Sequence, residues 1–218
     1  YLLGAVMATV VVHRPQRHNG LLVGLIFSAL TTFACALITS YYLWLGVRFL
    51  SGIASAFAFI LGTAIVIEAL ARHARPHLIS THFAGLSLGI IGSVLIIEGA
   101  NIFDYSIFAQ WGVLGFASFV MLSIAWMILR SLPREPAESP AVINAHSEDT
   151  PNRALQRLIL AYGLFGFGYV VTATFIVAIA REFENAVLLE PATWIAVGLV
   201  GGPSLFVWHY FSGRFGVF

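Results

Sequence analysis

The sequence contains no lysine and a single cysteine, and each scarcity excludes a kind of chemistry. Without lysine, neither a retinal Schiff base nor a pyridoxal phosphate aldimine can form on this chain. One cysteine, Cys35, excludes an internal disulfide framework and a cysteine-based metal cluster. Charged residues are 10% of the chain, whereas soluble domains carry about 25%. The net charge of +1 provides no basic field for nucleic acid, so we expect no nucleic-acid partner.

Catalytic signatures are also scarce. The sequence has no His-Glu-x-x-His motif and, without lysine, no phosphate-binding loop of the Gly-Lys type. It offers no nucleophile and base at a recognisable spacing. We therefore expect no enzyme, no cofactor, no metal site and no ATP-driven mechanism within this chain.

The scarcity of charged residues is matched by a large share of apolar residues. They make up 59% of the 218 residues, and the mean hydropathy is +0.90. Six apolar segments are about 20 residues or longer, the length that crosses a hydrocarbon core of about 30 Å as a helix. A seventh, 1–12, reaches only about 18 Å and reads as a helix cut at its start. The sequence predicts an all-α integral membrane protein with about seven segments: 1–12, 20–39, 41–67, 79–98, 111–130, 156–180 and 191–213.

Arginine placement predicts the orientation of these segments. If the loop at 13–19 is cytoplasmic, nine of the eleven arginines fall in cytoplasmic loops. The opposite loops hold Arg181, and Arg48 lies within a span. This asymmetry supports both the topology and the number of spans of a multi-pass protein, with the lipid bilayer as its surroundings.

One stretch, 131–155, differs in composition from the rest. It holds four of the eight prolines, few large apolar residues and charges of both signs. Such a segment cannot bury a core, so it predicts a flexible cytoplasmic linker. The linker would separate a transmembrane bundle at 1–130, with its first helix missing, from the start of a second bundle at 156–218.

Several motifs resemble one family of transporters. The opening Tyr1-Leu2-Leu3-Gly4-Ala5, the run from Arg48 to Ala56, and Gly166-Phe167-Gly168-Tyr169-Val170-Val171-Thr172-Ala173-Thr174-Phe175 are similar to the second, fourth and seventh helices of the YbfB/YjiJ-like subfamily of the major facilitator superfamily. The resemblance covers essentially the whole chain, as helices two to eight of twelve. The subfamily is bacterial, so the resemblance implies two helical bundles and a secondary transporter of the bacterial inner membrane. Rocking of the two bundles about a mid-membrane site would then move a small solute. In the turn at 213–216, Gly213 stands where the superfamily usually has an acid.

Arg48 is the most unusual residue of the predicted spans. An arginine near a helix centre costs roughly 2.5–3.5 kcal/mol on insertion scales. At helical spacing it shares a face with Gly52, Ser55, Phe59 and Gly62, which we call the Arg48 face. Arg48 and Ser55 are therefore candidates for lining a cavity that binds an anionic substrate group. The alternative is that Arg48 reaches outward to the lipid headgroups.

The segment 156–180 combines Gly166 and Gly168 with Tyr169 and Thr172. Glycines let a membrane helix bend or break where a cavity satisfies its backbone, and the two hydroxyls could then bind substrate. The alternative is that the glycines permit close helix packing and the hydroxyls bond the backbone one turn earlier.

Coupling and packing residues are expected elsewhere. Gly85 and Gly89 form a small-xxx-small pair that favours helix packing. His82 is a candidate proton relay, or else an interfacial histidine. Glu68 precedes Arg72 by four residues, a spacing that favours an ion pair and makes Glu68 a candidate gate residue, or else a solvated helix end.

The function that these observations favour is secondary active transport of a small organic solute, with protons as the first candidate for the coupling ion. A seven-helix membrane receptor or scaffold without transport is the alternative, and a membrane-embedded enzyme ranks third. Substrate identity and direction of transport do not follow from the residues.

Overall fold

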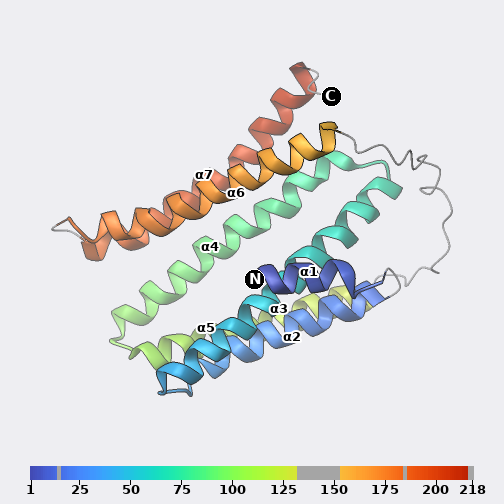
Figure 1. The fold of residues 1–218 in the computed structure, drawn as a ribbon. Helices are drawn as coiled ribbons and strands as arrows, with labels where there is room; N and C mark the ends of the chain where they lie inside the picture. The colour runs from blue at the N-terminus through green and yellow to red at the C-terminus, as the bar shows by residue number, and fades with distance from the viewer. Residues whose placement is uncertain (14–15, 132–152, 184–185, 216–218) are drawn as a thin grey trace. The chain divides into compact units, whose positions relative to one another are not determined.

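A computed structural model describes residues 1–13, 16–131, 153–183 and 186–215. These residues form seven α-helices and no strand, which confirms the all-α prediction (Figure 1). A short 3-10 turn, η2, covers Pro76–Leu78. The helices are α1 (Leu2–Val10), α2 (Arg17–Ala34), α3 (Tyr41–Arg72), α4 (Ile79–Ile102), α5 (Ile107–Ser131), α6 (Arg153–Ala180) and α7 (Ala186–Phe215).

Five of the described helices, α3 to α7, are long and apolar enough to cross a membrane. The sequence predicted six long spans, and α2 accounts for the difference. It has 18 residues and begins with Arg17-His18-Asn19, which lower its mean hydropathy. It also ends at Ala34, before a turn at 35–37, whereas the apolar run continues to residue 39. At about 27 Å, α2 is still close to the thickness of a hydrocarbon core.

The contacts divide the chain into two units, residues 1–137 with 198–218 and residues 138–197. In the first unit, α2 packs against both α3 and α5, and α1 packs against α3. Helix α4 touches α3 and α5 more sparsely. The second unit contains α6 and the first part of α7. The predicted linker at 131–155 lies mostly outside the described residues, because 132–152 are not among them.

Glycines set the closest helix contacts of the first unit. A Cβ added to Gly115 of α5 would lie 2.6 Å from the Phe33 Cα of α2. One added to Gly24 of α2 would lie 2.9 Å from the Ala58 nitrogen of α3. Small residues let membrane helices approach backbone to backbone, where dispersion contacts are densest. These two glycines therefore fix how α2 fits between α3 and α5.

Two helices of the first unit end in the same capping motif. After α3, the Arg75 nitrogen donates to the Leu70 oxygen at 2.9 Å and the Ala74 nitrogen to the Ala71 oxygen at 3.2 Å. After α4, Tyr105 and Asp104 make the equivalent bonds to Ala100 and Asn101. This is the Schellman pattern, which requires a left-handed residue just past the helix. Ala74 and Asp104 fill that position, with φ of 54° and 55°.

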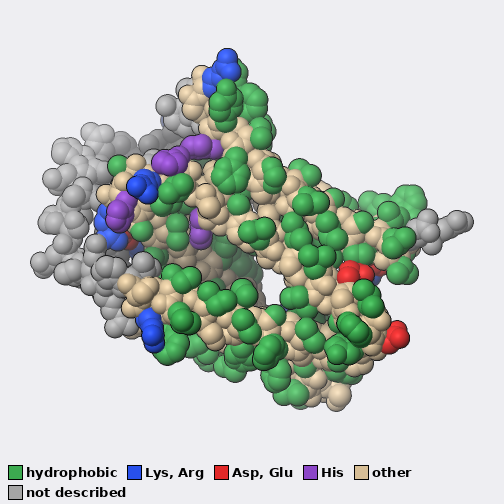
Figure 2. Space-filling model, turned by 180° about the vertical axis from the view of Figure 1, so that it is seen from behind, with side chains coloured by type: hydrophobic (Ala, Val, Ile, Leu, Met, Phe, Trp, Pro, Cys, Tyr) green, Lys and Arg blue, Asp and Glu red, His purple; other side chains and the backbone are tan. Residues whose placement is uncertain are grey.

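The helices present hydrophobic side chains over most of their surface, as Figure 2 shows. Charged side chains are few and most lie near helix ends, as with Arg17 at the start of α2 and Arg130 at the end of α5. Arg48, the eighth residue of α3, is the exception. A surface of this kind suits a lipid environment and would be unusual in water. The structure therefore agrees with the integral membrane class that composition predicted.

Candidate functional site

A cavity of about 520 Å³ lies in the first unit, among α2, α3 and α4. Its volume is in the range of small-molecule sites in proteins. Its lining is mostly apolar, with three hydroxyl-bearing residues and one imidazole. The lining residues are Tyr1, Ser28, Ser55, Ala58, Phe59, His82 and Leu86. The sequence singled out Ser55 and His82 as candidates. They lie on different helices, α3 and α4, and both line this cavity.

His82 is oriented by a hydrogen bond across two helices. Its Nε2 lies 3.2 Å from the Thr63 hydroxyl of α3, and its ring contacts Phe83 edge-on at 5.2 Å between centroids. The side chain is half-buried. The Ser55 hydroxyl donates to the Gly52 oxygen of its own helix at 3.1 Å. In the cavity, the imidazole of His82 therefore has a partner on α3, and the hydroxyl of Ser55 is bonded to the backbone of its own helix.

Arg48 does not line this cavity. Its guanidinium lies over two indole rings, 5.9 Å from the centroid of Trp44 and 5.2 Å from that of Trp111. The fully buried Cys35 lies within electrostatic reach of the same guanidinium. Distances below about 6 Å are those of cation–π contacts. Arg48 is thus held where α3, α5 and the end of α2 meet, seven residues before Ser55 on the same helix face.

Glu68 pairs with a residue of another helix. Its Oε2 lies 3.3 Å from the Arg17 Nη1 of α2, and the side chains are 43% and 27% exposed. The sequence favoured Arg72, one turn along α3, as the partner. The ion pair shown instead joins the start of α2 to the end of α3.

In the second unit, α6 runs unbroken from Arg153 to Ala180 through Gly166 and Gly168. The break that the glycines made possible is absent from this helix. The Thr172 hydroxyl donates to the Gly168 oxygen at 3.0 Å, which is the backbone alternative. Tyr169 is 53% exposed. Both side chains lie on the surface of the unit that contains them.

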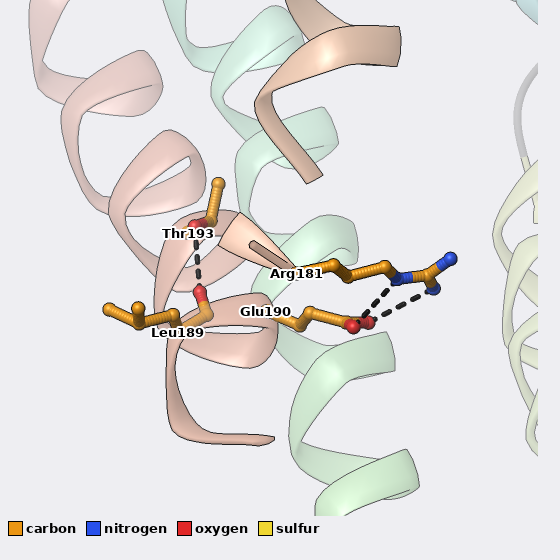
Figure 3. A network of polar contacts seen from close by, with 4 residues as sticks. All are labelled: Arg181, Leu189, Glu190 and Thr193. Atoms are coloured by element: carbon orange, nitrogen blue, oxygen red, sulfur yellow. Dashed lines mark hydrogen bonds and ion pairs between the residues drawn. The ribbon is translucent and has the colours of Figure 1, made fainter. Parts of the chain in front are cut away.

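An ion pair joins α6 to α7 across their turn (Figure 3). The Arg181 Nε and Nη2 donate to the two carboxylate oxygens of Glu190 at 2.7 and 3.1 Å. The hydrogen bond from Arg181 raises the pKa of that guanidinium, with the Glu190 charge adding to it. In the same view the Thr193 hydroxyl donates to the Leu189 oxygen. Beside these residues is a smaller cavity of about 200 Å³, lined by Ile176, Ile179, Ala180, Phe183, Leu189 and Thr193.

The glycines predicted to pack have different surroundings. No described atom of another helix lies within 4 Å of a Cβ added to Gly85, Gly89, Gly166 or Gly168. A Cβ at Gly52 would lie 3.1 Å from the nitrogen of Tyr1, the residue just before α1, so that glycine does face another part of the chain. The described residues therefore contain no packing partner for the pair on α4. The letters Gly85-Leu86-Ser87-Leu88-Gly89 also match a nucleophile elbow, but an elbow needs a strand-to-helix turn and this run is mid-helix.

Sequence reasoning missed Ser28, Thr63 and the two tryptophans around Arg48. Thr63 follows Phe59 by one turn, so helical spacing could have placed it beside the Arg48 face. Ser28 is a lone hydroxyl in an apolar run of α2. Trp111 lies 63 positions after Arg48, and no local spacing connects them. Only the packing of both α3 and α5 against α2 brings this indole to the arginine.

These features define a multi-pass α-helical membrane protein with a solute-sized cavity among its helices. Among the described residues, no group of three or more His, Cys, Asp or Glu side chains could hold a metal ion.

A family model described as "Uncharacterised MFS-type transporter YbfB" matches residues 1–218, and the chain belongs to this family of transporters. Neither a search of curated proteins nor a search of solved structures finds a match. The family membership agrees with the resemblance that the sequence showed to the second, fourth and seventh helices of the YbfB/YjiJ-like subfamily.

Proposed function

We propose that this protein is a secondary active transporter that moves a small organic solute across the bacterial inner membrane by alternating access. Residues 1–130 would form the N-terminal bundle, 131–155 the cytoplasmic linker and 156–218 the start of the C-terminal bundle. The observation that carries the proposal is the cavity among α2, α3 and α4, where Tyr1, Ser28, Ser55 and His82 are the polar residues of a mostly apolar lining.

The cavity lining suits a solute with an apolar body and a few hydrogen-bonding groups. Phe59, Ala58 and Leu86 provide apolar contact area, and hydroxyls such as that of Ser55 would fix orientation. Arg48 lies about 10 Å along α3 from Ser55 and would attract an anionic group of the solute. Tyr169 and Thr172 are the candidates that the second bundle would contribute.

His82 is the candidate coupling residue of this proposal. An imidazole is the side chain whose ordinary titration lies nearest physiological pH, and this one lines the cavity with a hydroxyl partner. Protonation would turn its second nitrogen into a donor and place a charge beside the solute. Glu68, paired with Arg17, would act as a gate at one end of the bundle by breaking and remaking that pair.

The experiment uses the full-length protein in proteoliposomes with an imposed pH gradient. Uptake is measured for a panel of labelled small carboxylates and their uncharged alcohol counterparts. We expect uptake of at least one compound above that of empty vesicles, and its loss in Ser55→Trp, which fills the cavity. Ser93→Trp is the matched control, because Ser93 is exposed on α4 and bonds its own backbone. Wild-type uptake by Ser55→Trp would contradict the proposed path.

A second variant tests the proposed role of Arg48. Arg48→Ala should reduce uptake of carboxylates more than uptake of the alcohols. If uptake and its pH dependence are both unchanged, Arg48 has no part in the mechanism.

A further inference from the structure

Arg48 occupies an unusual electrostatic environment. No carboxylate of the described residues contacts Arg48; Glu68 pairs with Arg17 and Glu190 pairs with Arg181. A cation within a membrane helix is costly unless something compensates its charge. The groups that the structure places against its guanidinium are two indole faces and a buried thiol.

The two indoles come from different helices and contact each other. Trp44 precedes Arg48 by one turn of α3, and Trp111 comes from the first turns of α5. Their rings meet edge-on, 6.2 Å between centroids. The negative faces of the rings attract the cation, and their mutual contact holds the pair in one geometry. Arg48 is thereby fixed to α5 as well as to its own helix.

We infer that Trp44 and Trp111 are positioning residues for Arg48, forming an aromatic clamp that stands in for a carboxylate counter-charge. The clamp holds the cation without neutralising it, so the charge stays available to an anion. A carboxylate in the same place would form an ion pair that a solute must first displace. This inference rests on the proposed function, in which Arg48 attracts an anionic group of the solute.

The clamp predicts that Trp111 acts through Arg48. Its test is a double-mutant cycle on the thermal unfolding midpoint of the full-length protein in detergent. We expect Trp111→Leu to lower the midpoint by several degrees in the wild-type background and by much less in an Arg48→Gln background. Trp111→Phe, which keeps an aromatic face, should recover at least half of the loss. An equal loss in both backgrounds would overturn the clamp, because Trp111 would then be ordinary core.

A spectroscopic readout keeps the inference testable where a variant unfolds. Arg48→Gln removes a cation from two indoles, so the tryptophan emission of the folded protein should change in intensity or wavelength. Arg130→Gln is the matched control, since Arg130 lies 5.7 Å over Trp126, one turn earlier in the same helix. The Arg130→Gln substitution removes one cation from one indole. It should leave the coupling between Arg48 and Trp111 in the double-mutant cycle unchanged. No emission change in Arg48→Gln would contradict the clamp.

A transport measurement distinguishes failure of the aromatic clamp from failure of the proposed function. For a labelled carboxylate that the wild type takes up, Trp111→Leu should raise KM about tenfold with little change in maximal rate. If the unfolding cycle shows coupling while KM stays constant, the clamp exists and the role of Arg48 in solute binding fails. If KM rises without coupling in the cycle, the clamp itself fails.

Discussion

The hydrogen bond between His82 and Thr63 decides how α4 presents its imidazole to the cavity. Because α4 contacts α3 sparsely, one side-chain bond between them matters more than it would in a dense interface. We predict that Thr63→Val lowers the free energy of unfolding by about 1 kcal/mol, since it leaves His82 without this partner.

The matched control is Thr174→Val. The Thr174 hydroxyl donates to the Val170 oxygen of its own helix, so its loss should change stability by only a few tenths of a kcal/mol. Reversible unfolding in mixed micelles measures both variants. Equal losses would mean that the contact between His82 and Thr63 contributes nothing specific.

Residues were predictable from the sequence where their signal is local. Helical spacing placed Ser55 and Phe59 on one face, and both line the cavity. The partners of Arg48 and Glu68 were not predictable, because each involves a contact between helices far apart in sequence. Local spacing pointed from Glu68 to Arg72, while the fold brings Arg17 to it from 51 positions away.

At the scale of single helices, packing depends on where a glycine meets a neighbouring backbone. Gly115 has no room for a side chain, because an added Cβ would overlap Phe33. We predict that Gly115→Ala lowers the free energy of unfolding by about 1–3 kcal/mol, as α2 and α5 must separate. Gly46→Ala is the control, since a Cβ there meets nothing within 4 Å, and we expect it to be neutral or stabilising. A destabilised Gly46→Ala together with a neutral Gly115→Ala would reject the observed packing of α5.

The backbone just after α3 is strained at Ala74, and a substitution to glycine should relieve that strain. Ala74 occupies the left-handed position of a Schellman motif, with φ of 54°, where glycine pays no steric cost. We predict that Ala74→Gly raises the free energy of unfolding by about 0.5–1 kcal/mol, net of the extra freedom of glycine in the unfolded chain.

The comparison for this prediction is Ala69→Gly, one turn inside the same helix. There glycine relieves no strain and should cost about 1 kcal/mol. Thermal unfolding of both variants gives the sign. A loss of stability in Ala74→Gly would show that the turn after α3 does not have this geometry in the protein.

Apolar runs in the sequence predicted that each helix exists, but they predicted the residues at which the helices end less accurately. The sequence placed all seven segments, because hydropathy alone forces long apolar runs into helices in a membrane. It missed the early end of α2, since the residues after Ala34 are as apolar as those before it. What ends α2 is a turn whose Cys35 is buried by tertiary packing, which composition cannot reveal.

For the whole molecule, the arginine distribution and the segment 131–155 together predict the topology. Nine of the eleven arginines would lie on the same side as that linker. We predict that trypsin cuts the full-length protein after Arg134 in inside-out membrane vesicles and leaves that bond uncut in sealed right-side-out ones, where Arg181 would be accessible instead. Cleavage from the outside only would reverse the topology, and protection on both sides would place the segment within the membrane.

The most direct test of the transport mechanism asks from which side the cavity can be reached. Ser55→Cys is introduced into full-length protein in which Cys35 is replaced by alanine, and a charged, membrane-impermeant thiol reagent is added to either face of sealed vesicles. Alternating access predicts reaction from both faces, because each conformation opens the cavity to one side in turn. The control, Ser106→Cys in the loop between α4 and α5, should react from one face only. Reaction of Ser55→Cys from a single face, or from neither, would contradict the transporter mechanism.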